Sequence, residues 1–162
     1  KGKKVVLTAL PENADACIAK VAAAWELCGA IIHRLSAEEH DAVFAAVSHL
    51  PHLLAYALVD DIAARDNSAR LFQYAASGFR DFTRIAGSSP EMWRDISLAN
   101  RPALLAELDA YTAQLAQLRA LLAASDGAGL EKIYGRAQAA RQAWIAAIEA
   151  AEQARAEEQG GD

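Results

Sequence analysis

The chain has 162 residues, 54% of them hydrophobic, and a formal net charge of −5, which suits one ordinary domain with a substantial core. Its lysines and arginines are scattered along an acidic chain, so no basic surface for nucleic acid is indicated. Abundant alanine and leucine with only four prolines favour a mainly α fold.

The first 35 residues predict a β-α-β unit. Residues 5–8 form a β-branched strand, a helix capped by Asn13 or Asp15 ends before Gly29, and residues 30–35 form a second strand. A two-stranded sheet with helices on one side is seldom a complete α/β domain. We therefore expect the chain to be part of a larger protein.

The two cysteines and the N-terminal residues bear on the cell compartment. Cys17 and Cys28 are eleven positions apart on the predicted helix. Their Cα atoms would be about 16 Å apart, which is too far for a disulfide. No signal peptide is visible in "KGKKVVLT". We expect reduced thiols in a cytoplasmic protein.

A long helix is predicted to begin at "SAEE", residues 36–39, which matches a capping box. It is apolar nearly all round as far as Ile62, as expected of a central helix wrapped by others. Its most apolar part, residues 42–59, contains two histidines and is shorter than the roughly 20 residues of a membrane span. The pattern therefore favours a buried helix of a soluble protein.

Polar residues interrupt this helix at "SHLPH". Ser48 and His52 share a helix face, with His49 nearby, and Pro51 cannot donate a backbone N–H, so we expect a bend there. Such a stretch suits the entry of a small polar ligand. The four histidines of the chain all lie between positions 33 and 52: His33, His40, His49 and His52.

Other roles for the polar residues are open at this point. A histidine on a core helix often has only a structural role. A metal site is possible because His49 and His52 are three positions apart, but the set of further ligands is thin. A nucleophile role for Ser48 lacks the G-x-S-x-G context.

The segment "GFRDFTRIA", residues 78–86, contains three charged side chains. Arg80 and Arg84 are four positions apart and project the same way, with Asp81 between them. They form either an ordinary solvated face or, if one guanidinium reaches a pocket lined by His52, a clamp for a carboxylate.

Two C-terminal helices are predicted from large residues at alternating spacings of four and three, a pattern typical of a coiled-coil seam. The first seam is Leu104, Leu108, Tyr111, Leu115, Leu118 and Leu122. The second is Leu130, Ile133, Ala137, Ala140, Trp144, Ala147 and Ala151. Large residues can pack over small ones, so we expect an antiparallel pair joined at "SDGAG".

Several segments together resemble the C-terminal half of the prephenate and arogenate dehydrogenases of tyrosine biosynthesis. They are "SAEEHDAVFAAVSHLPHLLAYAL", "GFRDFTRIAGSSPEMWRDI" and "LEKIYGRAQAARQAW". The "VVLTALPENAD" and "GAIIHRL" segments resemble the last β-α-β unit of that family's nucleotide-binding domain. The resemblance implies domains at residues 1–35, from the nucleotide-binding domain, and 36–162, for substrate binding and dimerisation.

The resemblance also implies an activity and roles for residues. Enzymes of the family oxidise and decarboxylate prephenate to 4-hydroxyphenylpyruvate, passing hydride to NAD or NADP. By resemblance His52 and Arg84 bind the substrate, and Ser48 and His49 line the site. The supporting residues implied are Asp41, Arg80, Asp81 and Trp93. The resemblance also implies an interlocked homodimer. We expect the chain to bind no metal, no nucleic acid and no membrane.

The sequence departs from the family pattern in two respects. No G-x-G-x-x-G follows a predicted strand, and the histidine that the family uses at the ring hydroxyl is absent. We therefore expect the fragment alone to be inactive, with the catalytic histidine and most of the cofactor site upstream. The alternative is a non-enzymatic helical module for dimerisation or regulation that binds tyrosine or another small acid.

Overall fold

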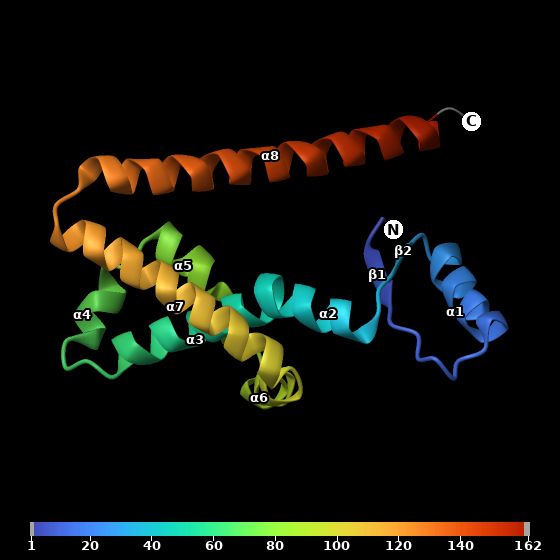
Figure 1. Cartoon of the computed structure of the whole chain (residues 1–162), viewed down its shortest axis with the longest axis horizontal. Coiled ribbons are helices and arrows are strands. Elements are labelled where there is room, and N and C mark those ends of the chain that lie inside the picture. The colour runs from blue at the N-terminus through green and yellow to red at the C-terminus, as the bar shows by residue number, and fades with distance from the viewer. Residues whose placement is uncertain (1, 161–162) are drawn as a thin grey trace. The chain divides into compact units, whose positions relative to one another are not determined.

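The computed structural model describes residues 2–160, and the side chains of residues 2–154. The chain divides into two compact units, Lys1–Ala110 and Tyr111–Asp162, and each is described by itself. Figure 1 shows the order of the elements. They are β1 Lys4–Leu7, α1 Asp15–Leu27, β2 Ile31–Arg34, α2 Ala37–Phe44, η1 Ala45–His49, α3 Leu50–Ala63, α4 Ser68–Gln73, α5 Ser77–Thr83, η2 Arg84–Gly87, α6 Pro90–Ala99, α7 Arg101–Ala123 and α8 Gly127–Gly160.

The predicted β-α-β unit is confirmed. Strands β1 and β2 pair in parallel, with Lys4 opposite Ile31, and α1 packs against β2. Helix α1 ends where predicted, because Gly29 takes a φ of +79°, a left-handed conformation that glycine adopts at little cost. Both Cys17 and Cys28 are exposed free thiols. The fold class is therefore mainly α with a small parallel sheet at the N-terminal end.

The predicted cap of α1 is wrong. The N-cap position is Ala14, and no side chain bonds to the first turn there. Asn13 instead accepts a hydrogen bond from the backbone N–H of Leu10 at 2.9 Å, which closes the turn that precedes the helix. A short polar side chain next to a helix start can serve either the turn or the cap, and here the turn uses it.

The long helix consists of α2, η1 and α3 without a break. Its capping box is confirmed, because the Ser36 hydroxyl accepts from the Glu39 N–H and the Glu39 carboxylate accepts from the Ser36 N–H. Segment η1 is a π-helical turn, in which Leu50 N–H bonds to the carbonyl of Ala45. The irregularity expected from Pro51 thus takes the form of a π turn directly before it, with the proline in the first turn of α3.

The expectation that this helix is buried is wrong for a single chain. Only 17% of its most apolar window is buried, and it has the length and mean hydropathy of a possible membrane span. Ala45, Leu50 and Ala55 are covered, whereas Val43 and Val47 are exposed. The covered side faces other helices of its own chain, since α3 packs against α4, α5 and η2.

Helix α6 is anchored beside α3. The Ser89 hydroxyl caps the helix by accepting from the N–H of Met92, and Pro90 occupies the first turn. The Tyr56 hydroxyl donates to the carbonyl of Ser88 at 2.7 Å. This bond joins the middle of α3 to the start of α6, so the two helices present side chains to the same region.

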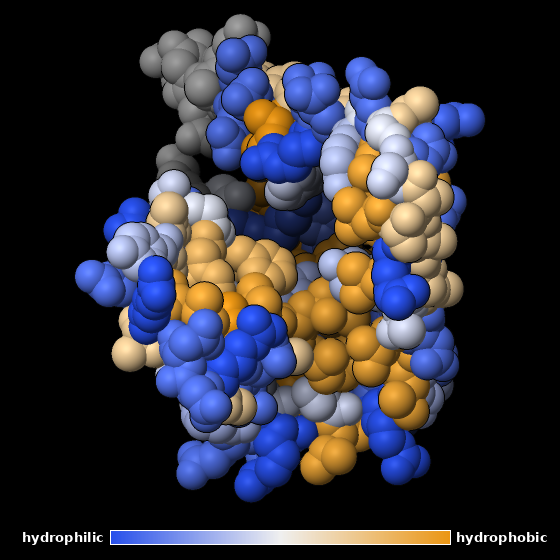
Figure 2. All heavy atoms as spheres, turned by 90° about the vertical axis from the view of Figure 1, so that its left-hand side faces the viewer, coloured by the Kyte–Doolittle hydropathy of each residue, from blue (hydrophilic) through white to orange (hydrophobic). Residues whose placement is uncertain are grey.

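The two C-terminal helices form as predicted, with a turn at Ser125, but their seams do not pack together within the described chain. Leu115 is 46% exposed and Trp144 is 59% exposed. The predicted antiparallel packing inside one chain is therefore wrong. Figure 2 shows hydrophobic residues in broad patches on the face that it displays.

Candidate functional site

The π turn places two histidines of the long helix beside α6. His52 lies part-buried one turn after η1, and its ring stacks on that of Trp93 with centroids 3.5 Å apart and planes 17° apart. The His49 ring meets Trp93 edge-on at 6.1 Å. Trp93, one of the supporting residues that the resemblance implies, therefore packs against both imidazoles.

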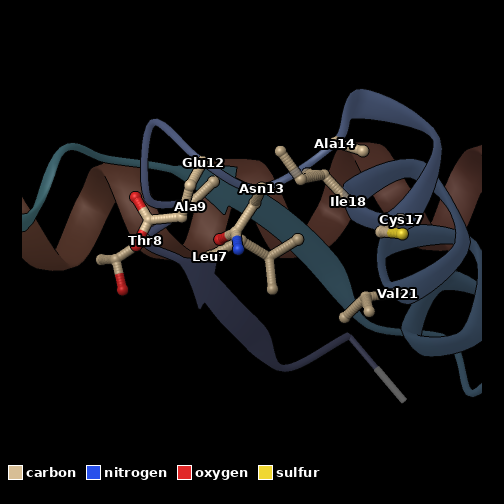
Figure 3. A pocket seen from close by; sticks show the side chains of 9 residues that line it. All are labelled: Leu7, Thr8, Ala9, Glu12, Asn13, Ala14, Cys17, Ile18 and Val21. Atoms are coloured by element: carbon tan, nitrogen blue, oxygen red, sulfur yellow. The ribbon is translucent and has the colours of Figure 1, made fainter.

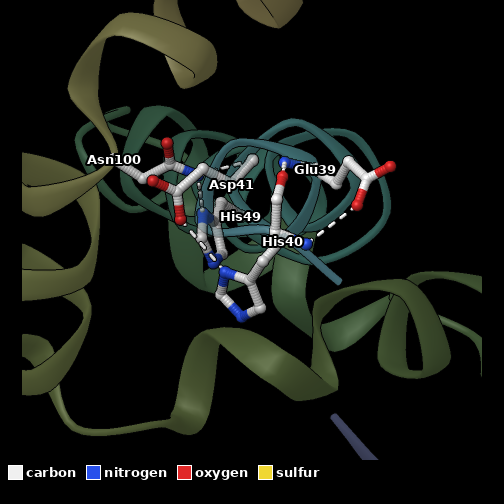
Figure 4. A network of polar contacts seen from close by, with 6 residues as sticks. Glu39, His40, Asp41, His49 and Asn100 are labelled. Atoms are coloured by element: carbon white, nitrogen blue, oxygen red, sulfur yellow. Dashed lines mark hydrogen bonds and ion pairs between the residues drawn. The ribbon is translucent and has the colours of Figure 1, made fainter. Parts of the chain in front are cut away.

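Each of these imidazoles has one nitrogen fixed by a neighbour. His52 Nδ1 lies 2.9 Å from the carbonyl oxygen of Ser48, one turn earlier. A carbonyl only accepts, so this nitrogen carries a proton. His49 Nδ1 lies 3.1 Å from the side-chain nitrogen of Asn100 (Figure 4). Ser48 thus contacts His52 through its backbone carbonyl.

A histidine and an aspartate form a pair at the start of the long helix. His40 Nδ1 is 3.0 Å from Oδ1 of Asp41 (Figure 4). The His40 ring also stacks on that of Phe44. Burial lowers the pKa of His49 below its ordinary value, and the nearby His40 and His52 lower it further while Asp41 raises it. His49 is therefore held in its neutral form near pH 7.

Trp93 carries an unused donor. Its indole Nε1 is buried and has no hydrogen-bond partner, and no other buried side-chain nitrogen or oxygen in the described residues lacks one. A buried N–H without an acceptor costs about 1 to 3 kcal/mol. Such a group is ready to donate to an oxygen that enters the site.

The predicted charged residues lie on α5 and η2. Arg80, Asp81 and Arg84 are exposed, and none forms an ion pair or a hydrogen bond through its side chain with the described residues. Segment η2, which begins with Arg84, packs against α3, the helix of His52. The fold thus brings His40, His49 and His52 together with Asp41 and Trp93. The two guanidinium groups have no side-chain partner among the described residues.

A cavity of about 230 Å³ borders Trp93. Its walls are mostly apolar, and three polar lining residues, Tyr56, Arg94 and Ser97, were not predicted as site residues from the sequence. A larger cavity of about 550 Å³ lies apart, at the carboxyl end of β1 beside α1, with Thr8, Asn13 and Cys17 in its lining (Figure 3). In the described residues, no group of three potential metal ligands is present.

The most informative residue that sequence reasoning missed is Asn100. It is buried, with 6% exposure, and it contacts both His49 and the backbone of Asp41 from the end of α6. A signal existed, because an asparagine directly after an amphipathic helix is a common helix end. Nothing in the sequence, however, indicated that the side chain turns toward residues more than fifty positions away.

Comparison with known proteins identifies the family of this helical region. The family "Prephenate dehydrogenase, dimerization domain" matches residues 36–136, which is more than half of the chain. The chain belongs to the prephenate dehydrogenase family. Cyclohexadienyl dehydrogenase of Zymomonas mobilis is 42% identical over 141 residues, covering 86% of this chain and 48% of that protein.

Solved structures agree with the family assignment. Prephenate dehydrogenase of A. aeolicus, in complex with hydroxyphenyl propionate and NAD+, has a TM-score of 0.81 and 37% identity, covering 88% of this chain and 50% of its own. Arogenate dehydrogenase of Synechocystis has a TM-score of 0.76 and 27% identity, covering 87% of this chain and 52% of its own. This member of the family thus spans about half the length of the relatives that it matches.

Proposed function

We propose that this chain is the substrate-binding and dimerisation part of an NAD- or NADP-dependent prephenate or arogenate dehydrogenase. The whole protein would convert prephenate to 4-hydroxyphenylpyruvate by oxidative decarboxylation in the cytoplasm. The observation that carries the proposal is the π turn η1, which sets His49 and His52 against Trp93 inside the region that matches the family. π turns occur often at functional sites.

We place the domain boundary at Ser36. Residues 1–35 form the β-α-β unit, which we assign to a nucleotide-binding domain, and residues 36–162 form the substrate-binding and dimerisation domain. The family match begins at residue 36, where the capping box also starts the long helix. A sheet of two strands buries little apolar surface, so this unit needs further strands for independent stability.

The site residues divide by chemistry. Arg84 is the proposed carboxylate ligand, because a guanidinium can hold a carboxylate by two parallel hydrogen bonds and this one has no ion-pair partner in the described residues. His52 contacts the substrate, and Ser48 and His49 line the site. Asp41, Arg80, Asp81 and Trp93 support these four.

The residues present do not supply a dinucleotide cradle. The turn between β1 and α1 reads "TALPENA", with no glycine that would let the backbone approach a pyrophosphate. A bound nicotinamide would accept the hydride, and this chain's part is to bind and orient the acid that loses it. We accordingly assign no catalytic residue to the chain.

We propose a homodimer held by the apolar surfaces of the helical region. The side of the long helix that carries Val43 and Val47 is exposed in one chain, as are Leu115 and Trp144 on the C-terminal helices. Large exposed apolar patches mark interaction surfaces. A second copy would cover it, and the long helix is then a core helix of the dimer.

Calorimetric titration of this chain with prephenate, arogenate and tyrosine tests the proposal. We expect prephenate or arogenate to bind, and Arg84→Ala to weaken that binding at least about a hundredfold, because a charged contact is lost. Arg70→Ala removes an exposed arginine of α4 and is the matched control. A loss of less than about threefold with Arg84→Ala contradicts the assignment, and binding of tyrosine alone favours a regulatory module.

A further inference from the structure

Asn100 connects two parts of the long helix from the end of α6. Its side-chain nitrogen lies 2.8 Å from the backbone carbonyl oxygen of Asp41 and 3.1 Å from Nδ1 of His49 (Figure 4). It is buried, with 6% exposure, whereas most polar residues of this chain are exposed. Burial of an amide is costly unless its hydrogen bonds are made, so these two contacts fix which way the Asn100 amide faces.

The hydrogen-bond partners decide where the protons lie. The carbonyl of Asp41 can only accept, so the amide nitrogen of Asn100, rather than its oxygen, must face it. That nitrogen has a second N–H, which points to Nδ1 of His49. A nitrogen that accepts this bond has no proton of its own. His49 is therefore neutral, and its single ring proton is on Nε2.

The surrounding charges are arranged to keep this state. The Asp41 carboxylate, which would stabilise a protonated His49, is bonded to Nδ1 of His40 at 3.0 Å. His40 from α2 and His52 from α3 both oppose a positive charge on His49, and burial acts in the same direction and more strongly, so the pKa of His49 is lowered. The facing residues on α6 and after it, Trp93 and Asn100, carry no charge.

We propose that Asn100 is a positioning residue that fixes the tautomer of His49, so that His49 presents an N–H donor, and not a lone pair, to an oxygen of the bound acid. The proposal rests on the proposed function, because it takes His49 as part of the ligand site. His52 has the opposite tautomer when neutral, since its Nδ1 proton is bonded to the carbonyl of Ser48. With His52 neutral, the two imidazoles thus offer one donor and one acceptor.

The tautomer can be read directly from the imidazole ¹⁵N resonances of the labelled chain between pH 5 and 8. In the wild type we expect His49 to have a bare Nδ1 and a protonated Nε2 at pH 7.5. Asn100→Asp keeps the shape of the side chain but replaces the donor with an acceptor. The proton should then move to Nδ1, and the pKa of His49 should rise by about 1 unit or more. Asn67→Asp, at the exposed start of α4, should leave His49 unchanged.

The same variants connect the tautomer to binding. Affinity for prephenate should fall about tenfold in Asn100→Asp, which is the loss expected when one hydrogen bond to a charged ligand is removed. If Asn100→Asp fails to fold, Asn100→Ser serves instead. Its loss of the donor to Nδ1 should give a mixture of His49 tautomers and weaker binding.

Three results would overturn the proposal: a protonated Nδ1 in the wild type, an unchanged tautomer in a folded Asn100 variant, or a changed tautomer with unchanged affinity. A wild-type chain that has the expected tautomer and does not bind prephenate contradicts the proposed function instead. The tautomer is measured without any ligand, so these failures are distinguishable.

Discussion

The region around η1 and the helices of the C-terminal unit differ in which side chains are buried. Around η1, polar groups are partly or wholly buried, and His49, His52 and Asn100 have their partners within one chain. On the C-terminal helices, large apolar groups such as Leu115 and Trp144 are exposed. The first region makes its polar contacts within one chain, and the second is a surface that we propose a second copy covers.

The difference shows that one copy of the chain supplies partners for buried polar groups but leaves apolar side chains exposed. A buried amide or imidazole without a partner costs about 1 to 3 kcal/mol, so the hydrogen bonds of His49, His52 and Asn100 stabilise the folded chain. An exposed leucine forgoes roughly 1.5 to 3 kcal/mol of burial without preventing folding. The polar contacts around η1 therefore form in one chain. We propose that the apolar seams are stabilised by association with a second copy.

The largest expected effect concerns the exposed seam. Leu115→Glu places a charge where we expect a second copy to pack, so the dimer should dissociate, with a dissociation constant raised about a hundredfold or more. Sedimentation equilibrium measures this change. Gln114→Glu adds the same charge at the neighbouring exposed position of α7 and should have little effect. If both variants have the same dissociation constant, the seam that contains Leu115 is not part of the dimer interface.

A change of intermediate size is expected for the polar region. Asn100→Ala removes both hydrogen bonds from the amide and leaves a small gap beside His49, so the free energy of unfolding should fall by about 1 to 3 kcal/mol. Urea denaturation measures it, at one protein concentration so that dimerisation is constant. Asn67→Ala, in an exposed position, should change stability by less than about 0.5 kcal/mol. Similar values for both variants would mean that the buried amide stabilises nothing.

The smallest effect is the pH dependence of stability. The pKa of His49 in the folded chain is lowered from its ordinary value of 6.5, mainly by burial, so the unfolded chain binds more protons just below pH 6.5. Stability from the neutral ring is present above pH 6.5 and is lost as the pH falls from 6.5 through the folded pKa. Since the ring is only partly buried, we expect a loss below about 1 kcal/mol.

Urea denaturation of His49→Gln at pH 7.5 and 5.5 measures this contribution. Its loss of stability on acidification should be smaller than that of the wild type, whereas His33→Gln, an exposed change in β2, should match the wild type. If the wild-type chain becomes more stable than His49→Gln on acidification, the pH dependence has the opposite sign. That result would contradict a lowered pKa of His49.

Local patterns predicted much of the fold. The predicted capping box at Ser36 and the predicted end of α1 before Gly29 were both correct, because each depends on residues a few positions apart. The polar segment at "SHLPH" also indicated a local irregularity through Pro51. What it could not indicate was a π turn before the proline, since the choice of hydrogen bonds there depends on neighbouring helices.

Long-range contacts explain what the sequence did not reveal. Asn100 reaches Asp41 and His49 from another helix, and no spacing rule connects positions so far apart. Arg94 was missed because an exposed arginine on an amphipathic helix has no distinctive pattern. The packing of the C-terminal seams was assigned to one chain because heptad spacing predicts an apolar stripe but does not identify the partner that covers it.

We propose that the residues around η1 bind a small organic acid beside Trp93. The indole ¹H–¹⁵N resonances of the labelled chain, titrated with prephenate, test it most directly, because Trp93 has a buried free N–H while Trp25 and Trp144 are exposed. We predict that the Trp93 resonance shifts and saturates together with those of His49 and His52, while the other two indoles stay in place. An unmoved Trp93 resonance at saturating prephenate, or a shift confined to Trp25 or Trp144, would contradict the account.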